Sequence, residues 1–119
     1  MFLQAARIDS RRSADEIKQG KKYEMADYVI TYADGSTVKV PIYAEISVDD
    51  YKQQMPAALP GAQIAWTKPY AETPYSAVAY SMQWNNPSPE KVIKTIDLIY
   101  GPDKRGVPAL LAVTAARAE

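Results

Sequence analysis

The chain has 119 residues, and its 14 basic and 14 acidic side chains give a formal net charge of zero at pH 7. That length corresponds to one domain, and a neutral chain has no long-range attraction for a polyanion, so we expect no nucleic-acid partner. The sequence has no Cys and no His, which excludes disulfides, thiolate or imidazole metal sites and Ser-His-Asp triads.

The first twenty-two residues combine an apolar run with a charged segment. Residues 1–8 predict a strand, whereas residues 9–22 predict either a solvated loop or one short helical turn, because Ser13 and Glu16 have the spacing of a capping box. The opening residues, MFLQAARIDSRR, do not have the pattern of a secretory signal, and no apolar run is long enough to cross a bilayer. We therefore expect a soluble protein with no membrane partner, in a compartment that the sequence leaves open.

Alternation of apolar residues with a period of two predicts a β-hairpin after Tyr23. The residues that share its inward face are Tyr28, Ile30 and Tyr32 on the first strand and Val38, Val40 and Ile42 on the second. The intervening residues 33–36 have the composition of a tight turn. Pro41 removes one ladder hydrogen bond, so the second strand is expected at a sheet edge or to end there.

The rest of the chain predicts short strands separated by loops rich in Pro, Gly and Asn. They are 44–51, where Ile46 and Val48 alternate with Glu45 and Ser47; 63–67, with Ile64 and Trp66 on one face; 75–84, with Val78, Tyr80, Met82 and Trp84 on one face; 92–100; and 109–114. About seven short strands with at most one short helix indicate a single all-β domain over residues 1–119, an antiparallel β-sandwich.

Several phrases resemble the galactose-binding-like jelly-roll domain, an accessory module of bacterial glycoside hydrolases. They are YADGS at 32–36, VPIY at 40–43, LPGAQIAW at 59–66, MQWNNPSP at 82–89 and GVPALLAVTA at 106–115. The resemblance implies a jelly-roll topology and non-catalytic recognition of carbohydrate, an inference about function that rests on the fold family alone.

The same resemblance predicts an oligomer. In that family, strands precede a segment like MFLQAAR, so this chain corresponds to the later portion of the jelly roll and exposes sheet edges. We therefore expect a homodimer or larger homo-oligomer. The alternative is a complete small sandwich with an edge covered by residues 9–22.

Sugar recognition needs aromatic rings that stack on a pyranose face and polar side chains that bond its hydroxyls. The candidates are Trp66, Tyr70, Tyr75, Lys68, Glu72 and Asn85. Other roles compete with sugar binding. Trp66 shares a face with Ile64, and Trp84 continues the alternating apolar face of its strand, so both patterns favour a position in the core. Asn85 lies in a stretch with the composition of a turn.

A second hypothesis is a small glycoside hydrolase, which needs two carboxylates, within one subunit or across an interface. Glu45, Asp49, Asp50 and Asp97 are the candidates, although no spacing selects a pair and a solvated surface role is the alternative for each. Asp49, Asp50 and Asp34 have the ligand chemistry for calcium, but no defined calcium loop is present, so we expect no cofactor and no metal. A third hypothesis is a structural oligomerisation module with no ligand.

Overall fold

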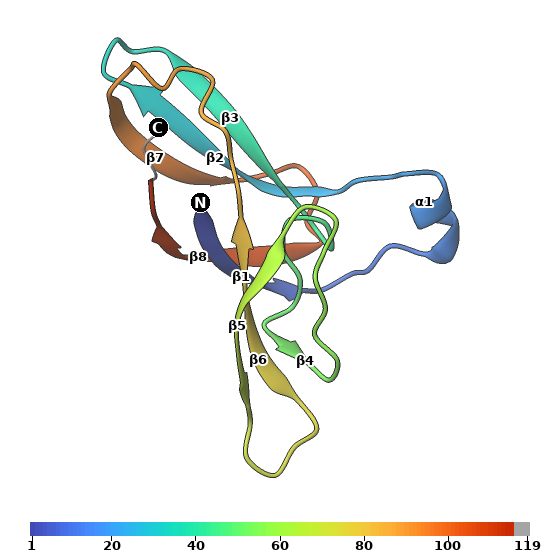
Figure 1. Ribbon diagram of the computed structural model, residues 1–119. Helices are drawn as coiled ribbons and strands as arrows, with labels where there is room; N and C mark the ends of the chain where they lie inside the picture. The colour runs from blue at the N-terminus through green and yellow to red at the C-terminus, as the bar shows by residue number, and fades with distance from the viewer. Residues whose placement is uncertain (116–119) are drawn as a thin grey trace.

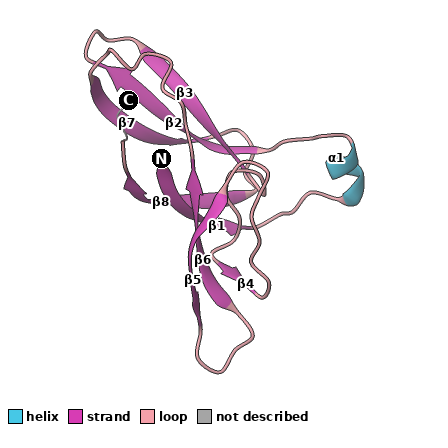
Figure 2. Cartoon of the chain, in the orientation of Figure 1, coloured by secondary structure: helices cyan, strands magenta, loops and turns pink. Residues whose placement is uncertain are grey.

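A computed structural model describes residues 1–115, which form eight strands and one short helix (Figure 1, Figure 2). In chain order they are β1 (Phe2–Ile8), α1 (Ala14–Lys18), β2 (Glu24–Tyr32), β3 (Thr37–Tyr43), β4 (Lys52–Gln53), β5 (Gln63–Pro69), β6 (Ser76–Met82), β7 (Ile93–Tyr100) and β8 (Gly106–Val113). The strands pair into two antiparallel sheets that stack as a sandwich, which confirms the predicted all-β fold class.

The larger sheet is built around β6. One edge of β6 pairs with β5; its other edge pairs with β1 and, further along, with the short β4, and β8 follows on the far side of β1. The smaller sheet has the order β3-β2-β7. Strands β5 and β8 are therefore the outer edges of one sheet, and β3 and β7 those of the other. The edge position predicted from Pro41 is confirmed.

The inner faces of the two sheets pack on one apolar core. The predicted inward faces of β2 and β3 and that of β6 are confirmed, and the buried residues there are Tyr28, Ile30, Tyr32, Val40, Ile42, Val78, Tyr80 and Met82. The ring of Phe2 stacks on that of Tyr28 with their centres 4.2 Å apart, which joins β1 of the larger sheet to β2 of the smaller one.

A polar group at the middle of this core is fully hydrogen-bonded. The side chain of Gln4 has no exposed surface; its Nε2 donates to the carbonyl of Ser47 at 2.9 Å, and its Oε1 accepts from the hydroxyl of Tyr28 at 2.7 Å. A buried amide without such partners would be strongly destabilising. The bonds therefore fix the loop at Ser47 against β1 and β2.

The strand predicted over 44–51 is wrong. Glu45 has a φ of 65°, and its N–H donates to the carbonyl of Val48 at 2.8 Å, so the chain makes a tight turn there. Ser47 and Val48 are both buried, which strict alternation does not allow. The turn is what brings the Ser47 carbonyl to Gln4.

The charged segment at 9–22 contains α1. Ser13 Oγ accepts from the Glu16 N–H at 3.1 Å, and Glu16 Oε1 accepts from the Ser13 N–H at 3.0 Å, so the capping box forms and a solvated loop is not adopted. Figure 1 shows this segment extending from the sandwich on the side opposite β7. It therefore does not cover the β7 edge. The one helix of residues 1–115 is five residues long, and no helix there is fit to cross a membrane.

Candidate functional site

The β5–β6 arm, which comprises β5, the turn at 70–75 and β6, extends beyond the sandwich (Figure 1). A bulge sets the direction of its side chains. Ile64 pairs with Tyr80 but Trp66 pairs with Ala79, so Ala65 is an extra residue in the strand. Ile64 consequently packs against the core, whereas Trp66 turns to the outward face and is 52% exposed. The prediction that the two share a face, and that Trp66 belongs to the core, is wrong.

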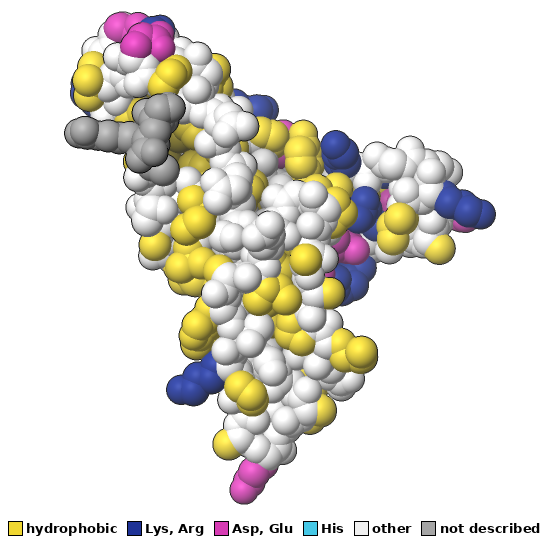
Figure 3. All heavy atoms as spheres, viewed as in Figure 1, with side chains coloured by type: hydrophobic (Ala, Val, Ile, Leu, Met, Phe, Trp, Pro, Cys, Tyr) yellow, Lys and Arg dark blue, Asp and Glu magenta, His cyan; other side chains and the backbone are white. Residues whose placement is uncertain are grey.

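The two tyrosines of the turn lie on the same outward face. The N–H of Tyr70 donates to the carbonyl of Tyr75 at 3.0 Å, which continues the ladder in which Lys68 pairs with Ala77. Because directly paired residues point to the same side of a sheet, Trp66, Lys68 and both tyrosines face outward together. Tyr70 is exposed, Tyr75 is half-buried, and Figure 3 shows hydrophobic side chains along this arm.

A lysine from another part of the chain joins this face. Lys52 of β4 pairs with Ala77, and its Nζ lies 4.9 Å from the ring centre of Tyr75 and 5.9 Å from that of Tyr70. Sequence reasoning missed Lys52, because only the pairing of β4 with β6 brings it here. We call the outward residues Trp66, Lys68, Tyr70, Tyr75 and Lys52 the arm strip.

The arm strip is open and elongated. At about 3.3 Å per residue along a strand, the backbone positions of Trp66 and Tyr70 are about 13 Å apart. Exposed ring faces separated by lysine amines suit a ligand that is itself extended, with apolar faces and hydroxyl rims. Glu72 is exposed at the tip of the turn, where it has a φ of 61°.

Asn85 lies elsewhere, in a cleft of about 970 Å³ between the two sheets. The cleft is lined by Met1, Phe2, Gln83, Trp84, Asn85, Asn86, Pro89, Lys91, Ile93, Ile96, Val113, Thr114 and Ala115. Trp84 packs against Phe2, with ring centres 6.4 Å apart, and is half-buried. It therefore occupies the predicted core position with only part of its indole. Of the six candidate sugar-binding residues, the structure gathers the other five on the arm and separates Asn85 from them.

Two polar groups of the cleft already bond other parts of the chain. Asn86 Oδ1 accepts from the Tyr32 hydroxyl and from the Ser88 N–H, which is the turn role expected of this stretch. Lys91 Nζ lies 2.9 Å from Asp34 Oδ2. The cleft thus offers Trp84, Gln83 and Asn85 as its less constrained side chains.

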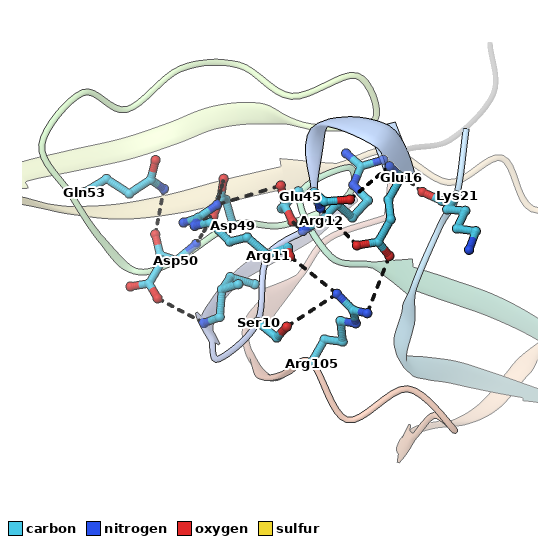
Figure 4. Close-up of polar contacts among 12 residues, drawn as sticks. Ser10, Arg11, Arg12, Glu16, Lys21, Glu45, Asp49, Asp50, Gln53 and Arg105 are labelled. Atoms are coloured by element: carbon cyan, nitrogen blue, oxygen red, sulfur yellow. Dashed lines mark hydrogen bonds and ion pairs between the residues drawn. The ribbon is translucent and has the colours of Figure 1, made fainter. Parts of the chain in front are cut away.

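Two of the four candidate catalytic carboxylates, Asp49 and Glu45, hold the charged segment in place, and a third, Asp50, bonds the backbone of β1 and β4 (Figure 4). Asp49 accepts from both terminal nitrogens of Arg11, at 2.8 and 3.3 Å. Glu45 Oε1 accepts from the N–H of Arg12 at 2.8 Å. Asp50 accepts from the N–H of Ile8 and from that of Lys52, each at 3.0 Å.

Each of these three carboxylates therefore has a structural role in the fold. Asp97 lies on β7 of the smaller sheet, exposed and opposite Val29, and does not join them. Asp34, considered for calcium, also lies apart: it bonds Ser36 and Lys91, which hold the pKa of its carboxyl well below its usual range. Over residues 1–115, no group of three or more carboxylates is placed to hold a metal ion.

Asp27, a residue that sequence reasoning did not single out, has a carboxyl with a raised pKa. Asp27, on the outward face of β2, is only 6% exposed, and burial raises the pKa of its carboxyl, with nearby Glu24 adding to the effect. Lys39 Nζ, 3.8 Å from Asp27 Oδ2, opposes the shift in part. A raised pKa is typical of a general acid. The cleft does not reach Asp27, however.

No protein-family model matches the chain, and no curated protein or solved structure is significantly similar to it. The resemblance to the galactose-binding-like domain therefore stays a prediction from the sequence.

Proposed function

We propose that the protein binds carbohydrate on the arm strip and does not cleave it. The observation that carries the proposal is the outward turn of Trp66 onto the face that holds Tyr70 and Tyr75. An indole that is half exposed on a strand with a bulge, rather than packed in the core, leaves a flat apolar surface free. Sugar rings present such a surface on one side and hydroxyls at the rim.

The geometry favours an extended chain of sugar units over a single sugar. The arm strip has no enclosing walls, and its rings are spread along the strand by about 13 Å. Lys52 and Lys68 stand between the rings, where their ammonium groups can donate to ring hydroxyls. The ligand class is therefore a neutral or acidic polysaccharide, bound along the length of the arm.

The acids give no support for hydrolysis. Glu45, Asp49 and Asp50 accept hydrogen bonds from Arg11 or from backbone N–H groups, and Asp97 lies on the other sheet. Glycoside hydrolysis needs two cooperating carboxyl groups, one of which must carry a proton. We accordingly propose binding without turnover.

The two tryptophans allow a test that locates the ligand. The Trp84→Phe variant keeps Trp66 as its one fluorescent indole, and the Trp66→Phe variant keeps Trp84. We expect soluble cellulose, xylan, mannan or chitin fragments to change the emission of the Trp84→Phe protein. Emission from the Trp66→Phe protein should stay unchanged.

Affinity measurements complete the test. Replacing Trp66 with Ala should weaken retention on the responding polysaccharide about tenfold or more, because the most exposed stacking ring of the strip is removed. Trp84→Phe is the matched control and should bind as the natural protein does. Binding that survives Trp66→Ala together with a signal from Trp84 would move the ligand to the inter-sheet cleft and contradict the proposal.

A further inference from the structure

Within the part of the chain that the structure describes, strand β7 has an unpaired backbone edge. It lies at the end of the smaller sheet, and no strand within residues 1–115 pairs with its outer side. From Thr95 to Tyr100 its register with β2 is unbroken, so this stretch is a regular ladder with every second N–H and C=O directed away from β2. Such an edge is a template for another strand.

The side chains of β7 do nothing to block that edge. The strand has no Pro, and Ile99 is 51% and Tyr100 68% exposed, while Leu98 is also exposed. Its one cation and one anion, Lys94 and Asp97, balance each other.

The other sheet edges differ in this respect. Strand β3 carries Lys39 and Pro41, and β5 ends in Lys68 and Pro69. Strand β8 contains Pro108, and its pairing with β1 is interrupted by a bulge. Proline and lysine are the usual means by which natural sheets discourage edge pairing. Among the four edges that residues 1–115 form, only β7 has a stretch, Thr95–Tyr100, that combines a continuous ladder with exposed apolar side chains and contains neither proline nor lysine.

We propose that β7 pairs antiparallel with β7 of a second copy of this chain, so that two three-stranded sheets become one continuous sheet. A strand that pairs antiparallel with its own copy is related to it by a two-fold axis, which closes the assembly at a dimer. The zero net charge of the chain means that two copies meet no overall repulsion. The new neighbour would cover the apolar side chains of Leu98 and Ile99.

The charges on β7 select a register. With the two-fold axis at Ile96, that residue faces Ile96 of the second copy, and Thr95 faces its Asp97. No like charges are then directly opposite. With the axis at Asp97, two aspartates would face each other, which is unfavourable. With the axis at Thr95 or Leu98, Asp97 would face an isoleucine, so only the axis at Ile96 gives its carboxylate a polar partner. The first register therefore predicts a hydrogen bond between Thr95 and the Asp97 carboxylate across the interface.

Thr95 also provides an internal control. It pairs with Thr31 on one side, and Thr37 of β3 pairs with Thr31 on the other, so the two threonines lie on the same outward face. Both are exposed. Thr95→Asp places a carboxylate against Asp97 of the second copy, whereas Thr37→Asp makes the same chemical change at the protected edge. Thr95→Lys places an ammonium against the same Asp97.

Light scattering on the full chain at about 0.1 mM, a concentration at which weak edge pairing is populated, is the test. We expect twice the chain mass of 13.2 kDa for the natural protein, Thr37→Asp and Thr95→Lys, and the single chain mass for Thr95→Asp. Amide hydrogen exchange should show the β7 amides that are directed away from β2 protected in the first three proteins and exposed in Thr95→Asp. Circular dichroism must show the same folded spectrum for all four.

Two results would overturn the proposal. One is a natural protein that stays at the single chain mass. The other is a dimer that persists in Thr95→Asp with β7 amides still exchanging, because such an interface would lie elsewhere. Neither outcome depends on carbohydrate, so this test and that of the arm strip fail independently.

Discussion

The aromatic residues between the sheets differ from those on the β5–β6 arm in whether their polar groups have a hydrogen-bond partner inside the protein. Tyr28 and Tyr80 are fully buried, and each hydroxyl bonds an amide side chain, Gln4 at 2.7 Å and Gln53 at 2.7 Å. On the arm, Trp66 and Tyr70 leave much of their surface to solvent. The same residue type stabilises the fold where its hydroxyl has a fixed internal partner, and is free for a ligand where it has none.

Burial also changes the chemistry of the interior tyrosines. Loss of solvent around the hydroxyl of Tyr28 raises its pKa to about 12. An ordinary tyrosine ionises near pH 10. The interior rings are therefore neutral, hydrogen-bonded spacers between the sheets. Four variants, ordered from the largest expected effect on stability to the smallest, test how far this contrast holds.

The largest effect is expected from Phe2→Ala. The ring of Phe2 is 2% exposed and stacks on Tyr28, so its removal leaves a cavity between the sheets. Such a change costs about 3–5 kcal/mol in the free energy of unfolding. Urea denaturation followed by circular dichroism measures it. A loss below about 1 kcal/mol would show that this part of the sandwich is not tightly packed.

A smaller effect is expected from Gln4→Leu, which removes the partner of the Tyr28 hydroxyl and of the Ser47 carbonyl. Each buried group left without a partner costs about 1–3 kcal/mol. The double variant Gln4→Leu with Tyr28→Phe should lose less than the sum of the two single variants, because the single variants together leave three unpaired groups and the double variant leaves only the Ser47 carbonyl. Strict additivity in a double-mutant cycle would contradict the bonded arrangement.

A change in the opposite direction is expected from Asp27→Asn. Burial raises the folded-state pKa of Asp27 above its unfolded value of about 4, so the folded chain holds this proton more tightly. The free energy of unfolding therefore falls as the pH rises from the unfolded pKa through the folded one. Asp27→Asn should remove that decrease and raise the melting temperature at neutral pH. Melting curves between about pH 3 and 8 check the sign; a variant less stable than the natural protein at pH 7 would contradict it.

The smallest effect on stability is expected from Tyr70→Ala. Tyr70 is exposed on the arm and contributes a ring contact with Lys52 at the surface. The free energy of unfolding should change by about 1 kcal/mol or less, while retention on the polysaccharide found with the fluorescence test should weaken. A large loss of stability would mean that the arm packs as the core does, and the contrast between the two regions would disappear.

Much of the fold was predictable because its signals are local. The alternation in Tyr28, Ile30 and Tyr32 fixes which face of β2 is buried, and the spacing of Ser13 and Glu16 fixes the cap of α1. The sequence also places Tyr70 and Tyr75 close together, since five positions and a turn separate them. Each of these depends on residues near one another in the chain.

The errors have equally specific causes. The extra residue Ala65 reverses the direction of Trp66, and no composition signal marks that bulge. The tight turn at Glu45 interrupts an alternation that otherwise indicates a strand. The sequence gives no partner for Asp49, because Arg11 is distant along the chain and only the fold brings it within hydrogen-bond distance of the Asp49 carboxylate.

Composition and periodicity by themselves determined that this is an all-β chain without thiol or imidazole chemistry, with its aromatic residues concentrated in tyrosine. Tertiary structure alone decided which rings face solvent, which acids are bonded to arginine or backbone, and which strands lie at the edges of the two sheets within residues 1–115. The physical reason is that strand periodicity is a property of neighbouring residues, whereas register, bulges and edges arise only when distant segments compete for the same backbone hydrogen bonds.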